Sequence, residues 1–502
     1  MTEASVIEID EPTAAQGHRV LAGESCALAD VLTASKATRE RGQDIAWRVA
    51  IGPRNVHAIE SVHRLAFDSG IEVQFATVSS LQGPDRVFFD DYVRYRLPVS
   101  RGERARRFVE EWTAAGGEAF SAALGLARPS RTRSTAPDHM DSVVIIGAYG
   151  GDHIGDAAIL GGTLLGLHRR YGTTRATVMS GRPDHTRRLC EGLSTPVSIE
   201  VAPYRAGAVD GALAKADGLV LGGGPLYGSP RILARHLAAV ASAHRRNLPF
   251  IIERIGMAYF GNAPTRWAGR RILESAARIS VRTSASARHP LMHGLQAEIG
   301  RDPAFDYLEG RGELDRLPSE DAAAVEQLLS GTEGSLKVGI NLRPTLDQWR
   351  DLSDLTQNTV DAAFIQNLAE GLIAFARAST RPVTYVFFPM NAIQLGMSDL
   401  SAAFELRRAL KGAVDLRVWE ADASLDGVIH LLRRLDTAIA MRFHASIFAL
   451  TQNVPLIGLD YFKGAGGKVS ELFTDLGRPE DACTVGRFTP EWLAERLGTH
   501  AR

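Results

Sequence analysis

The stretch DTAIAMRFHASIFALTQNVPLIGLD, residues Asp436 to Asp460, decides the fold class. Its apolar run Ala438–Met441 predicts a buried parallel strand, and residues His444–Gln452 predict the helix that follows. Val454–Leu459 then predicts the next strand. An apolar strand, a helix and a second apolar strand in succession are typical of an α/β fold with a parallel sheet.

Arg442 and His444 lie where the first strand of this stretch gives way to the helix. In open α/β sheets, ligands bind at the carboxyl ends of the strands, and a helix N-terminus offers free N–H groups to an anion. The pair therefore forms a candidate binding site with a permanent cation and a side chain that titrates near neutral pH. The alternative is structural: Arg442 pairs with a carboxylate and His444 caps the helix.

Strand and helix patterns alternate through two long parts of the chain. They predict two Rossmann-like domains facing a cleft, the glycosyltransferase-B-like arrangement, with a Gly-, Asp- and Glu-rich crossing between them. The first part has expected strands near 143–147, 175–179, 197–201, 218–221, 249–255 and 278–282. The second has them near 337–342, 383–388, 414–419, 436–441 and 454–459. The expected division is an N-terminal module over 1–126, a linker over 127–141, a first domain over 142–300, a connection over 301–335 and a second domain over 336–502.

The first 126 residues carry a weaker pattern. Residues 47–51 and 71–78 are expected strands, and a helix is expected near 56–69. We interpret this region as a small α/β module that either binds an acceptor or adds a structural layer to the first Rossmann-like domain.

Composition limits the partners and the compartment. The chain has 502 residues, of which 45% are apolar, and its 57 basic side chains balance 58 acidic ones. This balance predicts no nucleic-acid partner. Three widely spaced cysteines fit no disulfide framework, and no apolar run approaches the roughly 18 residues of a spanning helix. We therefore expect a soluble, cytoplasmic protein. Arginine clusters at 101–107 and 128–133 suggest a solvated face or hinge, or at most a peripheral membrane contact.

Neither glycine-rich segment matches a nucleotide-phosphate motif. Gly147 to Gly155 do not fit G-x-G-x-x-G, and Val469 after Lys468 breaks a P-loop pattern. Gly222, Gly223 and Gly224 follow an expected strand, so they allow a ligand or another segment to approach the backbone closely, or they form a tight turn. His289 and His293 stand four apart on an expected helix, but no acidic partner accompanies them, and we predict no metal site.

Four segments, taken in order, resemble the polysaccharide pyruvyl transferase family. They are SVVIIGAYGGDHIGDAAILGGTLLGLHRRY from Ser142, DGLVLGGGPLYGS from Asp217, RISVRTSAS from Arg278, and the segment with Arg442. Members of this family carry an Asn-x-Gly-Asp loop, a Gly-Gly-Gly strand end, an Arg-Asp-x-x-Ser segment and an Arg-x-His followed by a strand. The resemblance covers residues 142 to about 480. His153 replaces the family's Asn, and Thr283 replaces its Asp.

The resemblance implies transfer of an enolpyruvyl group from phosphoenolpyruvate to a sugar of a glycan precursor, with formation of a pyruvate ketal. Arg282 and Arg442, from different halves, match the arginines that would bind the doubly anionic donor. His444 is the expected general acid and Asp156 the expected base for the sugar hydroxyl, although Asp156 also suits a helix start. Gly222 to Gly224 and Lys468 are further expected binding residues.

Phosphoenolpyruvate is expected as a co-substrate, with no other cofactor, and the acceptor is a sugar or glycan, including one linked to a lipid. Two alternatives remain open at this point. The first is a glycosyltransferase of the same architecture that uses a nucleotide sugar, and the second is a non-catalytic sugar-binding relative.

Overall fold

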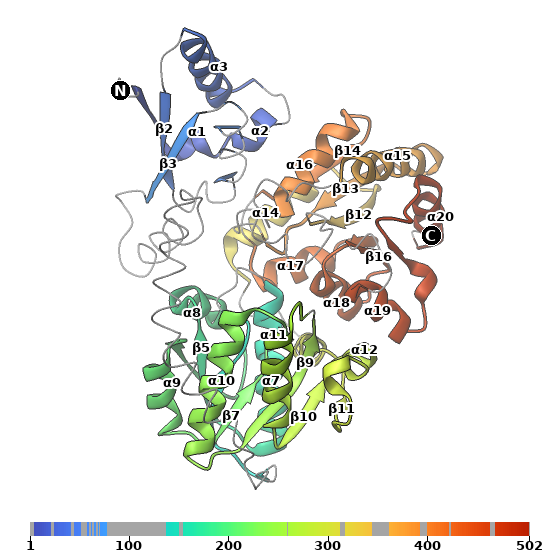
Figure 1. The fold of residues 1–502 in the computed structure, drawn as a ribbon. Coiled ribbons are helices and arrows are strands. Elements are labelled where there is room, and N and C mark those ends of the chain that lie inside the picture. The colour runs from blue at the N-terminus through green and yellow to red at the C-terminus, as the bar shows by residue number, and fades with distance from the viewer. Residues whose placement is uncertain are drawn as a thin grey trace. The chain divides into compact units, whose positions relative to one another are not determined.

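The protein divides into two compact units in a computed structural model. Unit 1 comprises Met1–Pro98 with Asp315–Arg502, and unit 2 comprises Val99–Leu314. Figure 1 shows the elements of each unit. The structure describes residues 5–21, 25–41, 45–51, 58–59, 62, 65–66, 69, 71–77, 137–149, 154–258, 260–311, 317–343, 361–391, 399–420, 423–461 and 467–500.

Unit 2 is built on a parallel sheet in the order β11-β10-β9-β7-β4-β5-β6, with β8 also paired to β9. Numbered along the chain, the main strands run 3-2-1-4-5-6-7, which extends the Rossmann order and reverses between β4 and β7. The strands are β4 (Ser142–Ile146), β5 (Arg175–Ser180), β6 (Ser198–Pro203), β7 (Gly218–Leu221), β8 (Pro225–Leu226), β9 (Phe250–Met257), β10 (Arg278–Val281) and β11 (Glu298–Ile299).

Helices connect these strands, and one glycine pair fixes how two helices of unit 2 pack. A Cβ on Gly162 would lie 1.8 Å from the carbonyl oxygen of Pro303, and one on Gly161 would lie 2.5 Å from the ring of Tyr307. Glycines in α7 therefore let α13 approach its backbone. The helices are α7 (Ile154–Tyr171), α8 (Pro183–Glu191), α9 (Ala206–Leu213), α10 (Pro230–Arg245), α11 (Ala263–Glu274), α12 (Ser284–Ala287), the 3₁₀ helix η2 (Pro290–Met292) and α13 (Pro303–Glu309).

Unit 1 contains a second parallel sheet with the order β14-β13-β12-β15-β16-β17. In chain order this is 3-2-1-4-5-6, the Rossmann order, and it reverses between β12 and β15. The strands are β12 (Leu336–Asn341), β13 (Val383–Phe387), β14 (Asp415–Val418), β15 (Thr437–Ala440), β16 (Leu456–Asp460) and β17 (Ala482–Thr484). The helices are α14 (Ser319–Leu329), α15 (Ala362–Ala378), α16 (Asp399–Leu410), α17 (Leu425–Leu432), α18 (Phe443–Thr451), α19 (Lys468–Asp475), η4 (Pro479–Asp481) and α20 (Pro490–His500).

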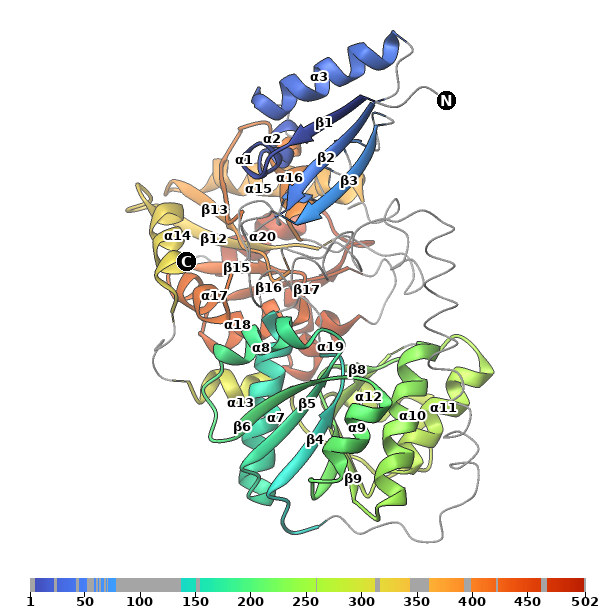
Figure 2. The same cartoon turned by 90° about the vertical axis from the view of Figure 1, so that its left-hand side faces the viewer.

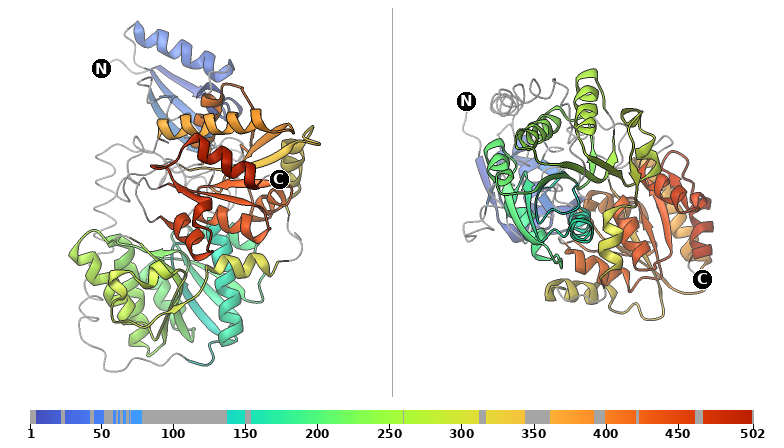
Figure 3. Two further views of the ribbon diagram at one scale, coloured as in Figure 1. Left: turned by 90° about the vertical axis from the view of Figure 1, so that its right-hand side faces the viewer. Right: turned by 90° about the horizontal axis from the view of Figure 1, so that it is seen from below.

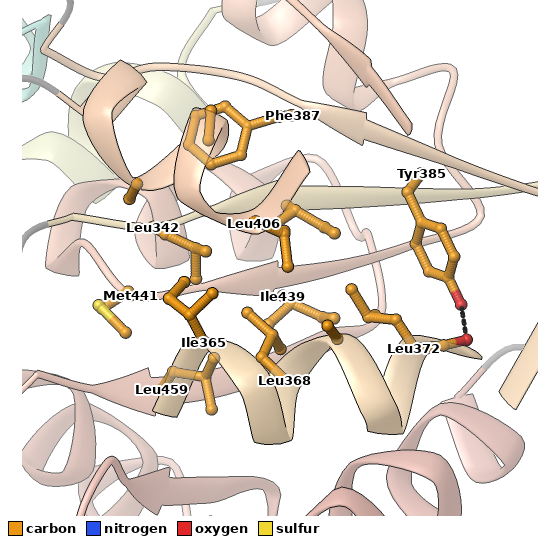
Figure 4. Close-up of a cluster of buried hydrophobic side chains, with 14 of the residues drawn as sticks. Leu342, Ile365, Leu368, Leu372, Tyr385, Phe387, Leu406, Ile439, Met441 and Leu459 are labelled. Carbon is orange, nitrogen blue, oxygen red and sulfur yellow. Dashed lines mark hydrogen bonds between the residues drawn. The ribbon is translucent and has the colours of Figure 1, made fainter. Parts of the chain in front are cut away.

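An apolar core of unit 1 lies between this sheet and helices that include α15. Figure 4 shows Ile365, Leu368 and Leu372 on one face of α15, directed at apolar side chains of the strands. Their spacing of three and four residues places them on one helix face. The Tyr385 hydroxyl also donates to the Leu372 carbonyl at 2.7 Å, which satisfies a buried polar group. α15 also lies beside α20, which contributes Leu493 and Leu497 to the same core, and both helices appear in Figure 3 in orange and red.

The N-terminal part of unit 1 forms a three-stranded parallel sheet, β1-β2-β3, visible in Figure 2. Its elements are β1 (Ser5–Ile9), α1 (Glu11–Ala14), α2 (Gly17–Leu21), α3 (Ala27–Glu40), β2 (Ile45–Ile51) and β3 (Glu72–Thr77). Trp47 is fully buried, and its indole nitrogen donates to the Ser35 hydroxyl at 3.0 Å. Ile51 and Ile59 belong to the same apolar cluster as the core of the second Rossmann-like sheet.

The predicted fold class is confirmed: two Rossmann-like sheets and a small N-terminal α/β module. Two observations bear on the expected organisation. The module groups with the second Rossmann-like sheet, not the first. The expected connection over 301–335 contains α13, which packs on α7, and α14, which packs on α17. Most of the expected helix near 56–69, the arginine clusters and most of the expected linker lie outside the described residues.

None of the helices in the described ranges combines the length and the apolar character required to cross a bilayer.

Candidate active site

The sheet of unit 1 places two arginines at its topological switch point. β12 and β15 are parallel neighbours in which Asn341 pairs with Ala440. Arg343 and Arg442 each lie two residues beyond that pair, so they occupy equivalent positions past adjacent strand ends. The Asn341 side chain stabilises this edge: its amide nitrogen donates to the Phe388 carbonyl at 3.0 Å, and its oxygen accepts from the Arg442 backbone N–H at 3.2 Å.

Arg442 is held by a buried carboxylate. Its Nε donates to Oδ1 and Oδ2 of Asp399 at 2.6 and 2.9 Å, and the two side chains are 5% and 0% exposed. Asp399 begins α16 and also accepts from the Met390 backbone N–H at 2.9 Å. Of the structural alternative for these two residues, the pairing of Arg442 with a carboxylate is therefore found. This pairing fixes the orientation of a guanidinium that carries five N–H donors.

His444 is the second residue of α18 and does not cap the helix. The N-cap position belongs to Arg442, whose side chain makes no capping bond. The imidazole is half-buried, its Nε2 has no solvent exposure, and its ring meets Phe443 edge-on at 5.3 Å between centroids. The structure thus places a histidine two residues after Arg442 in the first turn of α18.

Arg343 was not singled out from the sequence. It is 7% exposed, and its guanidinium carbon lies 4.1 Å from the ring centroid of Tyr461, which follows β16. Burial, with a smaller effect from the charge of Arg442, lowers the pKa of Arg343 to about 10, although Tyr461, Asp399 and Asp460 act in the opposite direction. Arg343 could have been recognised in the sequence because it follows an apolar strand, which is the same feature that identified Arg442.

Lys468 begins α19, whose N-terminus already holds a carboxylate of the protein. Asp460 is fully buried and accepts from the Ser470 backbone N–H at 3.0 Å. A Cβ on Gly467 would lie 1.8 Å from Asp460 Oδ1, so only glycine fits between them. The N-terminus of α19 therefore serves Asp460, and the half-buried Lys468 is the remaining candidate for a phosphate contact in this turn.

The glycines of unit 2 pack against another segment of the chain. Gly223 and Gly224 have φ of +72° and +98°, values that favour glycine. A Cβ on Gly223 would lie 2.3 Å from Tyr149 Cζ, and one on Gly147 would lie 1.9 Å from the Gly222 carbonyl oxygen. The glycines Gly222 to Gly224 therefore allow another segment of the chain to approach closely, which is one of the roles predicted for them. This contact lies at the switch point between β4 and β7.

Asp156 lies in the first turn of α7 and is half-buried. Burial raises the pKa of Tyr149 and of Tyr227, and the negative charge of Asp156 raises both further. Asp156 therefore influences both tyrosines electrostatically, and Tyr149 itself packs against Gly223. Asp152 and His153, which precede the helix, lie outside the described residues.

Arg282 follows β10 directly and is also ion-paired. Its Nη1 donates to Asp302 Oδ2 at 2.8 Å, with side-chain exposures of 3% and 1%. Asp302 caps α13 through the Ala304 backbone N–H at 3.0 Å. Thr283, which stands where the family has Asp, is the N-cap of α12 and accepts from the Ser286 N–H at 3.1 Å. Threonine therefore performs the capping role that an aspartate would also serve.

The expectation that His289 and His293 share a helix is wrong. Pro290 separates them, and the residues between them form the short helix η2, with His289 at its N-cap. His289 Nδ1 accepts from the Leu291 N–H at 3.2 Å. Throughout the described part of the chain, no three His, Cys, Asp or Glu side chains are grouped as metal ligands.

Comparison with known proteins identifies the family but no individual curated relative. No curated protein matches the chain. Among solved structures, UDP-GlcNAc 2-epimerase from Methanocaldococcus jannaschii is 12% identical with a TM-score of 0.48, and the match covers 72% of this chain and 92% of that one. An O-GlcNAc transferase variant from Thermobaculum terrenum is 16% identical with a TM-score of 0.42, covering 90% and 70%. A family 9 glycosyl transferase from Veillonella parvula is 10% identical with a TM-score of 0.35, covering 73% and 99%.

The family model described as polysaccharide pyruvyl transferase matches residues 153–463, more than half of the 502 residues. The match spans the elements that carry Asp156, Arg282, Arg442 and His444. The chain belongs to the polysaccharide pyruvyl transferase family.

Proposed function

We propose that the protein transfers the enolpyruvyl group of phosphoenolpyruvate to two hydroxyls of a sugar in a glycan precursor, giving a cyclic pyruvate ketal and inorganic phosphate. The observation that carries this proposal is the fixed, buried Arg442 two residues before His444 at a Rossmann switch point. Family membership supports pyruvyl transfer, and the identity of the donor is part of the proposal.

The donor requires cations because it carries a carboxylate and a phosphate. Arg442 and Arg282 present planar forks of donors that suit either group. Each is oriented by a buried aspartate, Asp399 for Arg442 and Asp302 for Arg282, so little side-chain freedom is lost when an anion binds. Lys468 is our candidate for an additional phosphate contact. Gly222 to Gly224 are assigned to shaping the backbone of unit 2 rather than to direct binding.

Ketal formation needs one acid and one base. We assign the acid to His444, which donates a proton to the methylene carbon of the donor as the first sugar hydroxyl bonds to the neighbouring carbon. Asp156 takes the proton from that hydroxyl. The second hydroxyl then attacks the same carbon, the carbon–oxygen bond to phosphate breaks, and the proton of this hydroxyl passes to the departing phosphate. Phosphate leaves with the bonding electrons, and the sugar keeps the pyruvyl carbons. The proposed reaction uses no resident metal or other cofactor.

The acceptor is a sugar or glycan, and we include lipid-linked glycans among the candidates. A glycosyltransferase would use a nucleotide sugar as donor instead, and a sugar-binding relative would use neither donor.

The test is calorimetric titration of the protein with phosphoenolpyruvate and, separately, with UDP-GlcNAc. We expect phosphoenolpyruvate to bind and Arg442→Lys to weaken it by about tenfold to a hundredfold, because lysine lacks the planar fork. Arg433→Lys is the matched control, since Arg433 is exposed and precedes β15 whereas Arg442 follows it. Binding of UDP-GlcNAc without phosphoenolpyruvate would favour a glycosyltransferase and overturn the proposal.

A further inference from the structure

We propose that Arg343 is a second donor-binding residue, which together with Arg442 forms a two-guanidinium anion site at the β12–β15 switch point of unit 1. The inference rests on the proposed function, because it names a further residue for the same phosphoenolpyruvate donor.

The sheet register carries the geometric part of the inference. Asn341 pairs with Ala440, and the ladder extends one step further through the Met441 N–H to the Asn341 carbonyl at 2.9 Å. Arg343 and Arg442 each lie two residues beyond the Asn341–Ala440 pair, at equivalent positions past the ends of the two strands. Figure 4 shows Leu342 and Met441, the residues before them, at the same end of the apolar core. Both arginines are thus positioned by one buried scaffold at the strand edge where ligands bind in such sheets.

Tyr461 orients Arg343 in a way that suits anion binding. The ring lies 4.1 Å from the guanidinium carbon, and Tyr461 is itself only 3% exposed. A stacked guanidinium uses its flat face for the ring, while its N–H donors lie in the plane and point along its edges. The contact with Tyr461 therefore helps to set the direction of those edges. A lysine at this position would keep the charge but would lack the planar fork.

The charges of the neighbourhood give the second argument. Two buried arginines near one another are unfavourable, and the proximity of Arg442 contributes to the lowered pKa of Arg343. The negative charges of Asp399 and Asp460 act in the opposite direction. Both carboxylates also bond to other groups: Asp399 accepts from Arg442 and Met390, and Asp460 accepts from the Ser470 N–H. A small dianion at this edge would relieve the repulsion between the guanidinium groups. Phosphoenolpyruvate, with a phosphate and a carboxylate a few bonds apart, is a ligand of that class.

The experiment measures phosphoenolpyruvate affinity by calorimetry for the wild type, Arg343→Met, Arg343→Lys and the exposed control Arg433→Lys, with the thermal unfolding temperature of each. Methionine keeps much of the side-chain volume and removes the charge, and replacing a buried charge by an apolar group is often neutral for stability or favourable. We expect Arg343→Met to bind phosphoenolpyruvate at least about tenfold more weakly and Arg343→Lys to bind several-fold more weakly. The control should match the wild type.

A purely structural Arg343 would give the reverse pattern. Its variants would unfold at lower temperature yet bind phosphoenolpyruvate as tightly as the wild type, and that result would overturn the inference. If Arg343→Met does not fold, the same decision rests on Arg343→Lys, which retains the cation and the aliphatic stem. Failure of the proposed function is distinguishable, because the wild-type protein would then bind no phosphoenolpyruvate.

Discussion

Arg442 and Asp399 form a buried ion pair in unit 1, with Arg442 Nε 2.6 Å from one carboxylate oxygen and 2.9 Å from the other. Asp399 begins α16, and Arg442 occupies the N-cap position of α18. The pair therefore ties together two helix starts that lie 43 residues apart in the chain. We therefore expect substitution of Arg442 to lower stability as well as the proposed donor binding, because it leaves a fully buried carboxylate behind.

Loss of Arg442 alone should destabilise the protein more than loss of the whole pair. Arg442→Met leaves the Asp399 charge uncompensated, and we expect the free energy of unfolding to fall by about 3 to 5 kcal/mol. Asp399→Asn combined with Arg442→Met should recover about 1 to 3 kcal/mol relative to the sum of the single changes. Urea denaturation of the wild type, both single variants and the double variant measures this coupling. Strictly additive effects would show that the pair contributes nothing beyond its separate residues.

His444→Gln should reduce turnover rather than donor binding. A positioned general acid contributes about a hundredfold to ten-thousandfold, so kcat should fall by that range while phosphoenolpyruvate affinity changes little. His430→Gln is the matched control, because His430 is another half-buried histidine on a helix of unit 1. Steady-state phosphate release and calorimetry separate the two quantities. An unchanged kcat in His444→Gln would remove His444 from the mechanism.

Asp156→Asn distinguishes a catalytic base from a helix-start carboxylate. As a base, Asp156 should contribute about a hundredfold or more to kcat. If it acted only on the helix dipole, its replacement would lower the free energy of unfolding by about 0.3 to 1 kcal/mol and leave kcat intact. Asp184 lies in the first turn of α8 in the same unit and pairs with Arg187, so Asp184→Asn reports the loss of a helix-start carboxylate that has no proposed catalytic role. Equal behaviour of the two variants would refute the assigned role.

Gly223→Ala should destabilise unit 2 because the new methyl group would overlap the Tyr149 ring, 2.3 Å away at Cζ. Gly294 has the same φ of +72° but open space around it, so Gly294→Ala measures the conformational effect alone, about 1 to 2 kcal/mol. We expect Gly223→Ala to cost about 1 to 3 kcal/mol more than this control. Chemical denaturation measures the free energy of unfolding of both variants. Similar values for both variants would mean that Tyr149 moves aside without strain.

Stability should decrease at acid pH through His236. This histidine of α10 is buried, and its Nδ1 lies 2.8 Å from the Tyr204 hydroxyl oxygen. Burial, with a smaller effect from the Arg235 charge, lowers its pKa from 6.5 to about 4. Between these values the unfolded state binds more protons, so the free energy of unfolding falls as the pH drops. We expect a loss of about 2 to 3 kcal/mol from this residue.

Urea unfolding of the wild type and His236→Gln at pH 7.5 and 4.5 isolates the contribution, because other titrating groups are shared. An identical pH dependence in both proteins would contradict the assignment.

Much of the fold follows from the sequence because central parallel strands are buried on both faces and appear as apolar runs. Every strand expected after residue 141 is present, including β15, in which all four residues are buried. The short strands β8, β11 and β17 were not expected, because two or three residues carry too little pattern. Pro290 also argued against a helix that contains both His289 and His293, since proline in a helix interior removes a hydrogen bond.

The candidate site was only partly predictable. Arg442 and His444 stand out because they follow a strong strand pattern directly. The residues around them cannot be recognised in the same way, because Asp399 and Tyr461 reach this edge of the sheet from other elements. Arg343 follows β12 just as Arg442 follows β15, but the sheet order that makes the two arginines neighbours appears only in the folded structure.

The central claim, pyruvyl transfer from phosphoenolpyruvate, is tested most directly by mass spectrometry of the acceptor. Wild-type protein, His444→Gln and Arg442→Lys are each incubated with isotopically labelled phosphoenolpyruvate and a panel of glycan acceptors, while released phosphate is measured in parallel. We predict that one acceptor gains the mass of one labelled pyruvate less one water, with one phosphate released per product, and that both variants form far less product. Transfer of a sugar from a nucleotide sugar, with no labelled product from phosphoenolpyruvate, would contradict the account.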